Sequence, residues 1–156
     1  MRILLDLAPS AEVDYESAVT LTVLETIRVE GAKAMKLPGA PSQPKIVVIR
    51  PPNTEVTPHE DLVVQALSMG APHKAVPMTV GLCLGVAANI KGTTAQRMVA
   101  QTRQKAKRED KLGNPVVLRH PGGTVEVSTR FDLTHQPFSV SVTRTGRWLM
   151  KGAIYW

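Results

Sequence analysis

Apolar residues recur at a helical period in YESAVTLTVLETIRVEGAKAMKL, residues 15–37. The apolar stripe comprises Thr20, Leu24, Ile27, Gly31 and Met35. This spacing predicts an amphipathic helix over the segment. Prolines and a glycine in the following LPGAPSQP forbid its continuation and predict where the helix ends.

Two short apolar segments follow this helix. KIVVIRPP, residues 45–52, is a β-branched run bounded by prolines, which predicts a buried strand. DLVVQALSM, residues 61–69, has apolar spacing that suits a helix or a strand. Its paired valines and its short length before Gly70 favour a strand.

The second half of the chain is rich in β-forming residues. The clearest alternation of apolar and polar residues runs from Val125 to Phe131. The turn sequences PGG, LTHQP and TGRW separate the apolar segments. The predicted strands are PVVLRH (115–120), TVEVSTRFD (124–132), FSVSVTRT (138–145) and AIYW (153–156).

Residues 77–89 have the length and composition of a second helix. Pro77 fits the first helical position, where a missing N–H costs nothing. Gly81 and Gly85 lie one turn apart on the same face, so we expect that face to pack closely against a neighbour. Gly92 predicts the end of this helix.

A helix followed by strands that curl round a second helix predicts an α+β roll. With 156 residues, 43% of them hydrophobic and 21% charged, the chain suits one compact domain over residues 1–156. The longest weakly polar stretch, 75–90, is too short to span a bilayer, and the N-terminus lacks a secretory signal pattern. One cysteine, Cys83, excludes an internal disulfide, so we expect a cytoplasmic protein with no membrane partner.

Most of the net charge of +6 lies in one segment. Residues 97–111, RMVAQTRQKAKREDK, hold six bases against Glu109 and Asp110, which leaves +4 there. No aromatic residue lies among these bases, so nucleic-acid bases have nothing to stack on. We therefore predict a solvated basic loop, residues 101–114, and no nucleic-acid partner. A nucleic-acid site here would instead bind with an affinity that falls steeply with salt.

Common catalytic and cofactor motifs are absent from the sequence. It has no phosphate loop, no dinucleotide-binding glycine motif, no Ser-His-Asp order and no Cys or His pair at zinc-ligand spacing. We therefore expect no cofactor and no metal. Cys83 lies between Leu82 and Leu84 in an apolar helix, which predicts a buried small residue and not a nucleophile.

His73 and Lys74 directly precede the helix predicted to start at Pro77. Free N–H groups and the positive end of the helix dipole favour a carboxylate at such a position. Thr79, in the first turn, could bind a ligand or cap the helix. For His73, an exposed loop histidine is the alternative interpretation. His120, in RHPGGTVEV, is predicted to lie in a tight turn that faces the same cavity.

Three ordered motifs carry a resemblance to a known family: LSMGAPHKAVPMTVGLCLGVAANIKGTT, VLRHPGGTVEV and TRTGRWLMKGAIYW. Over most of residues 20–156, including the KIVVIRPP strand, the chain resembles the C-terminal half of the PrpF family, which includes 2-methylaconitate isomerases and 4-oxalomesaconate tautomerases. The resemblance implies a diaminopimelate-epimerase-like fold of two α/β-roll lobes with a cofactor-free active site between them. This chain would be one lobe, a curved, mostly antiparallel sheet around a central helix.

The same resemblance implies which residues of this lobe line the cleft and bind the substrate. They are Met69, Gly70, His73, Lys74, Pro77, Met78, Thr79 and His120. The turn HPGG matches the family's HPSG with Gly122 in place of serine, so a hydroxyl contact made there by relatives has no counterpart. The proton-transferring lysine and the cysteine or serine belong to the first lobe of the family, so no catalytic residue is assigned in this chain.

We therefore expect the C-terminal lobe of an isomerase or tautomerase that moves a proton on an unsaturated di- or tricarboxylate and is inactive alone. A separate N-terminal lobe or a second copy of the chain would complete the cleft. The alternative is a non-catalytic binding or assembly module derived from such an enzyme.

Overall fold

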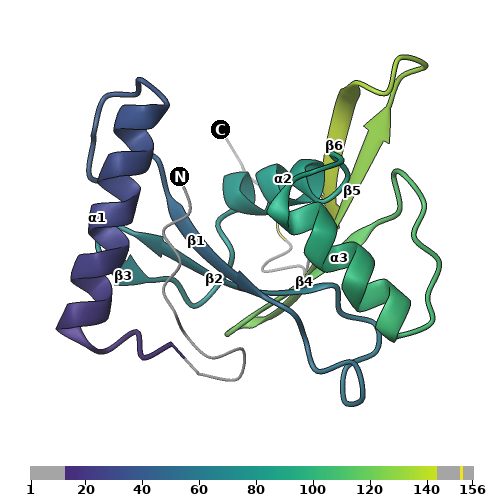
Figure 1. Ribbon diagram of the computed structural model, residues 1–156, viewed down its shortest axis with the longest axis horizontal. Coiled ribbons are helices and arrows are strands. Elements are labelled where there is room, and N and C mark those ends of the chain that lie inside the picture. The colour runs from purple at the N-terminus through teal and green to yellow at the C-terminus, as the bar shows by residue number, and fades with distance from the viewer. Residues whose placement is uncertain (1–12, 144–151, 153–156) are drawn as a thin grey trace.

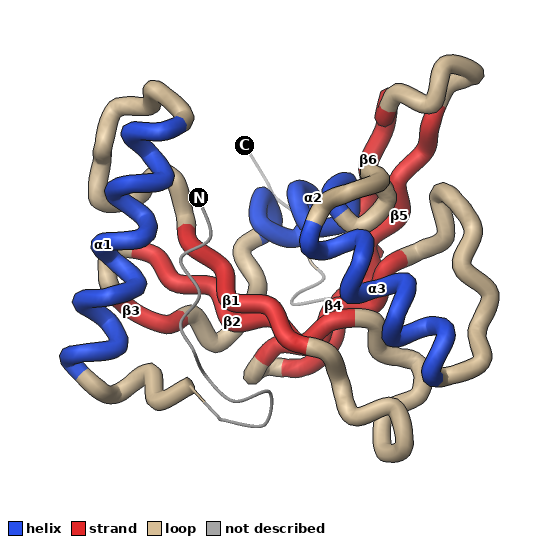
Figure 2. The backbone as a smooth tube through the Cα atoms, in the orientation of Figure 1, coloured by secondary structure: helices blue, strands red, loops and turns tan. Residues whose placement is uncertain are grey.

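The computed structural model describes residues 13–143 and residue 152 (Figure 1). Within these residues the chain forms three helices and six strands (Figure 2). In chain order they are α1 (Ala18–Ala34), β1 (Ile46–Arg50), β2 (Leu62–Ser68), β3 (Ala71–Pro72), α2 (Met78–Ala87), α3 (Thr94–Lys105), β4 (Val116–His120), β5 (Gly123–Phe131) and β6 (Pro137–Thr143).

The six strands form one mixed sheet in the order β1-β2-β4-β5-β6, with β3 paired to the end of β2. Neighbouring strands are antiparallel except β2 and β4, which are parallel. The parallel ladder has two register pairs, Leu62 with Leu118 and Val63 with Arg119. Because β3 pairs only with the last two residues of β2, residues 64–66 of β2 have no strand neighbour on that edge. The sheet therefore has a gap between β3 and β4.

One face of the sheet, the inner face, packs against α2 and α3, and the other is the outer face (Figure 1). Along β2, alternate residues Leu62, Val64 and Ala66 are buried on the inner face, while Val63 and Gln65 are half-buried on the outer face. The core cluster consists of Leu62, Val64, Ala66, Val76, Val80, Ala88, Ala95, Val99, Val116, Leu118 and Val127. Each fully buried valine or leucine side chain of this cluster stabilises the fold by about 1.5–3 kcal/mol.

The two glycines of α2 allow close packing on one face of the helix, Gly85 against β5 and Gly81 against Val76 in the preceding loop. A Cβ built at Gly85 would lie 3.0 Å from the Cβ of Val127, and one at Gly81 would lie 3.3 Å from a methyl group of Val76. The close packing expected from the glycine spacing is confirmed. The apolar alternation of β5 supplies Val127, which is fully buried beneath the helix.

The first helix, α1, lies beside β1 at one end of the sheet (Figure 1). Ser17 caps its N-terminus by accepting a hydrogen bond from the N–H of Thr20. The buried stripe includes Leu24 and, unexpectedly from the sequence, Arg28. The Arg28 guanidinium donates to the carbonyl oxygens of Ala40 and Gln43, each at 3.0 Å, and so ties the helix to the loop that follows it.

The predicted basic loop is wrong in its first part, because α3 continues to Lys105. Arg103 of this helix is also buried, with 2% of its side chain exposed. It donates to both carboxylate oxygens of Asp61, at 2.9 and 3.0 Å, and to Asp110 at 2.9 Å. Arg108 adds a third guanidinium contact to Asp61 at 2.9 Å. Two of the six bases, Arg103 and Arg108, therefore hold α3 to the start of β2. The other four, Arg97, Lys105, Lys107 and Lys111, are exposed, as expected for a solvated basic segment.

The other predicted elements are confirmed in type. The observed elements α1, β1, β2, α2, β4, β5 and β6 correspond, in this order, to the predicted ranges 15–37, 45–52, 61–69, 77–89, 115–120, 124–132 and 138–145. The predicted strand 153–156 lies outside the described residues.

Three details of these predictions are wrong. The strand β1 is half-buried, and not buried, because it is an edge strand of the sheet. Pro77 is the N-cap residue of α2 and not its first helical residue. The same helix ends at a C-cap at Ala88, while Gly92, with φ of 89°, lies in the turn before α3.

Candidate functional site

The loop that carries His73 and Lys74 crosses the gap in the sheet. The backbone N–H of His73 donates to the carbonyl oxygen of Ala66 at 2.8 Å, on the open edge of β2. The side-chain amide of Gln65 donates to the carbonyl oxygen of His73 at 2.9 Å. The chain then reaches the buried core residue Val76 and begins α2. These bonds fix the loop where β3 and β4 diverge.

The turn between β4 and β5 packs against this loop. His120 pairs with Gly123, so Pro121 and Gly122 form a two-residue turn. A Cβ built at Gly122 would lie 2.8 Å from the carbonyl oxygen of Lys74 and 3.4 Å from the His120 ring. Only glycine can occupy this position without a shift of one of the two segments. Two motifs far apart in the sequence therefore form one continuous wall.

A cavity of about 600 Å³ opens beside this wall, and we call it the His73 cavity. His73 and Lys74 are exposed and line it together with Asp14, Glu16 and Tyr15. Within the described residues Lys74 has no ion pair, although two carboxylates line the same cavity. The charge of this cavity is therefore mixed.

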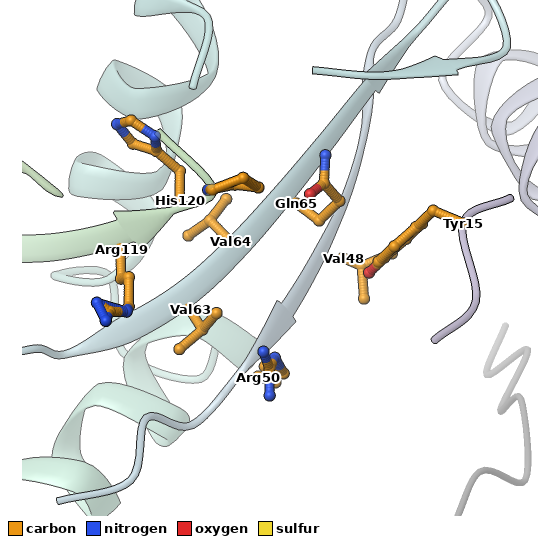
Figure 3. A pocket seen from close by; sticks show the side chains of 9 residues that line it. Tyr15, Val48, Arg50, Val63, Val64, Gln65, Arg119 and His120 are labelled. Atoms are coloured by element: carbon orange, nitrogen blue, oxygen red, sulfur yellow. The ribbon is translucent and has the colours of Figure 1, made fainter. Parts of the chain in front are cut away.

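A smaller cavity of about 170 Å³, the arginine cavity, adjoins the first one (Figure 3). The two share Tyr15, Gln65 and Pro121 in their walls. His120 belongs to the smaller cavity together with residues of β1, β2 and β4. Its ring nitrogen Nδ1 accepts the N–H of Gly122 at 3.1 Å. The His120 turn thus reaches the His73 cavity through Pro121, while the imidazole lines the neighbouring one.

Thr79 lies away from these cavities, in an apolar groove of about 400 Å³ between α2 and β1. Lys45, Val47 and Leu84 line this groove. Cys83 lines it too and is exposed, so its predicted burial is wrong. The reason is that the described part of the chain covers only one side of α2 closely, through the glycine face.

The remaining predicted residues take separate positions. Met69 and Gly70 line a small cavity next to Leu24 of α1, and Met69 is 70% exposed. Pro77 caps α2 without a side-chain hydrogen bond, and Met78 is 54% exposed. The structure therefore brings His73, Lys74 and the His120 turn together, and places the other predicted residues in different surroundings.

Burial raises the pKa of Tyr15, whose ring lies over Val48 in the wall between the two cavities (Figure 3). The positive charge of Arg50 acts in the opposite direction on this pKa. In the described residues no group of three or more His, Cys, Asp or Glu side chains is placed to hold a metal ion. No helix among them has the length and apolar character needed to cross a bilayer.

The model of the PrpF protein family matches residues 9–156. The chain belongs to this family. A 2-methyl-aconitate isomerase from Shewanella oneidensis is 31% identical over 152 residues, which cover 86% of this chain and 36% of the relative. The solved structure of a methylitaconate-delta-isomerase is similar in fold, with a TM-score of 0.63 and 20% identity, and the match covers 83% of this chain and 38% of that one. This PrpF chain therefore spans little more than a third of the length of these relatives.

Besides Asp14 and Glu16 of the His73 cavity, sequence reasoning missed four polar residues of the arginine cavity in this PrpF chain. They are Tyr15, Arg50, Gln65 and Arg119. Tyr15 and Gln65 lie in segments whose pattern predicts a helix and a strand and gives no sign of a cavity. One signal was available, because Arg50 and Arg119 each stand at the end of a β-branched run, where a charged side chain leaves the core pattern.

Proposed function

We propose that this chain is the C-terminal lobe of an isomerase that moves a proton on an unsaturated di- or tricarboxylate, of the 2-methylaconitate or 4-oxalomesaconate type. The observation that carries the proposal is the packing of Gly122 against the carbonyl of Lys74, because it joins the two family motifs into one wall beside a large cavity. The family membership and the isomerase activity named for the relatives support the same reaction class.

In this proposal His73 and Lys74 bind the carboxylates of the substrate. Removal of a proton next to the double bond leaves an allylic carbanion, whose charge spreads onto a carboxylate, and the proton then returns at a different carbon. Cationic side chains and helix dipoles stabilise that charge in the transition state. The first N–H groups of α2 would contribute, because Pro77 provides no side-chain cap.

The proton-transferring groups of the proposed enzyme lie in another lobe. Together the two lobes would form diaminopimelate-epimerase-like rolls around a cleft, and the mostly antiparallel sheet with α2 on its inner face is compatible with one such roll. Side chains and backbone dipoles carry the reaction without a cofactor, in the cytoplasm. The proposed binding site in this chain consists of His73, Lys74 and the His120 turn, because Met69 and Gly70 lie beside α1 and Thr79 lines the apolar groove.

The test is to add 2-methylaconitate to the purified 156-residue chain and follow both binding and turnover by NMR. We expect saturable shifts at His73 and Lys74 and little or no isomerisation without a second lobe. H73Q and K74Q should weaken binding, whereas K91Q, an exposed lysine in the turn before α3, should not. Absent binding to the folded chain, or equal binding by all three variants, would refute the proposed site. Turnover at the rate of a two-lobe enzyme would refute the assignment as an incomplete lobe.

A second candidate is a non-catalytic binding or assembly module. The observation in its favour is the apolar groove along α2, where Val47 and Leu84 meet the exposed thiol of Cys83. Such a module would pair with a separate N-terminal lobe or with a second copy. Sedimentation discriminates the candidates, because a monomer that binds tricarboxylate favours the first, and a self-associating chain that binds none favours the second.

A further inference from the structure

The arginine cavity holds two guanidinium groups that come from different strands. Arg50 of β1 and Arg119 of β4 are both register partners of Val63 of β2. Residues directly opposite one another in a sheet point to the same face, so both arginine side chains rise from the outer face. Adjacent strands lie about 4.8 Å apart, which places the two Cβ atoms roughly 10 Å apart. Long arginine side chains can converge on one ligand across that distance.

The walls of the arginine cavity carry positive and no negative side chains. Besides the two arginines they include His120 and the half-buried Tyr15 (Figure 3). Outside these walls, Glu60 pairs with one of the arginines, because its Oε1 lies 3.2 Å from Nη1 of Arg119. Among the described residues Arg50 has no ion pair. Glu60 therefore balances one guanidinium and leaves the charge of the other available.

Glu60 contacts Arg119 through only one of its two carboxylate oxygens. Glu60 is 7% exposed, and its Oε2 atom has no hydrogen-bond partner. This carboxylate therefore holds Arg119 by a single contact, which leaves the other guanidinium N–H groups of Arg119 free to bind an oxyanion. The contrast with Arg103 is direct, because that guanidinium is fully engaged with carboxylates and a carbonyl.

The size of the cavity limits the ligand. Its volume of about 170 Å³ is below the roughly 300–1,000 Å³ typical of sites for drug-sized molecules. Guanidinium groups bind carboxylate and phosphate oxygens in pairs, with planar geometry. We propose that the arginine cavity is a separate site for one small oxyanion, a carboxylate or a phosphate, bound between Arg50 and Arg119. This site is distinct from the one proposed at His73 and Lys74.

The experiment is a pair of NMR titrations of the full chain, one with inorganic phosphate and one with malonate, at constant ionic strength. We expect saturable shifts of the Arg50 and Arg119 Nε–H signals with at least one anion. Tighter binding of phosphate identifies a free phosphate site, and tighter binding of malonate identifies a carboxylate site. The absence of saturable shifts with both anions overturns the proposal.

Variants separate this site from general surface charge. R50Q should weaken binding about tenfold or more, because it removes charge-assisted hydrogen bonds. R130Q is the matched control, since Arg130 is exposed on β5 and lies outside the cavity walls. R119K keeps a positive charge opposite Glu60 but removes the planar guanidinium that can donate two parallel hydrogen bonds to an oxyanion. It should therefore also weaken binding. Equal affinity of R50Q and the unaltered chain, or an equal loss in R130Q, overturns the proposal. H73Q should leave the anion-dependent shifts of the Arg50 and Arg119 signals unchanged, so failure here is distinguishable from failure of the isomerase proposal.

Discussion

Gly122 packs so closely against Lys74 that a Cβ at position 122 would lie 2.8 Å from the Lys74 carbonyl oxygen. The contact joins the β4–β5 turn to the loop that crosses the gap in the sheet. Because a backbone carbonyl cannot rotate away as a side chain can, any larger residue must move the turn or the loop. The shape of the His73 cavity therefore depends on the absence of a side chain at one position.

Gly122→Ala should separate the turn from the loop. We expect a loss of about 1–3 kcal/mol in the free energy of unfolding, the usual cost of overpacking. Urea denaturation measures that loss, and the amide shifts of His73 and Lys74 should change at the same time. Gly39→Ala is the control, since a Cβ there has no neighbour within 4 Å. Unchanged amide shifts in a folded G122A chain would contradict the proposed packing.

Gly85→Ala should destabilise the protein although alanine favours helices. A Cβ at this position would press on Val127 of β5, at a cost of about 1–3 kcal/mol, against a gain of about 1 kcal/mol in helix propensity. Gly31→Ala in α1 is a matched control, because nothing lies within 4 Å of its Cβ, and it should stabilise by about 0.5–1 kcal/mol. Thermal unfolding of the two variants should therefore shift in opposite directions. A stabilised G85A chain would show that α2 does not pack as described.

Local patterns were sufficient to predict most of the elements. The alternation that predicted β5 depends on neighbours within the strand, and the glycine pair of α2 correctly indicated a close approach to another element. Both signals arise from residues a few positions apart. The helix α3 also had a local signal that was overlooked, because Thr93 caps it and Gln96 follows three residues later.

Pairings between distant residues were not predictable in this way. Arg103 looked like a solvated base, since its carboxylate partner Asp61 lies 42 residues away in the sequence. The register that places Arg50 and Arg119 on either side of Val63 exists only once β1, β2 and β4 are assembled. Sequence motifs indicated the His73 loop, but the charged neighbours of its cavity depend on the assembled sheet.

Asp61→Asn should be among the most damaging conservative substitutions in the chain. Asp61 is fully buried and accepts hydrogen bonds from Arg103, Arg108 and the N–H of Val117. Removal of its charge leaves a buried guanidinium without its main partner, so we expect a loss of about 3–5 kcal/mol. Asp110→Asn is the comparison, because Asp110 contacts the same arginine but is 40% exposed, and it should cost under about 1 kcal/mol. Guanidinium chloride denaturation of both variants measures the difference, and equal losses would show that the network does not depend on burial.

The titration of Tyr15 reports on its burial and on its neighbour Arg50. Burial raises the pKa of this tyrosine above its usual value of about 10. The unfolded chain therefore loses the phenol proton first, so the free energy of unfolding should be unaffected below pH 10 or so and fall as pH rises through the folded-state pKa. In a Tyr155→Phe background, ultraviolet absorbance of tyrosinate follows Tyr15 alone, with circular dichroism as the check that the chain stays folded. The positive charge of Arg50 stabilises tyrosinate, so its removal in R50Q should raise the Tyr15 pKa further. R130Q should leave this pKa unchanged. A midpoint at or below the usual value, or one that R50Q leaves in place, would contradict the position of Tyr15 between the two cavities.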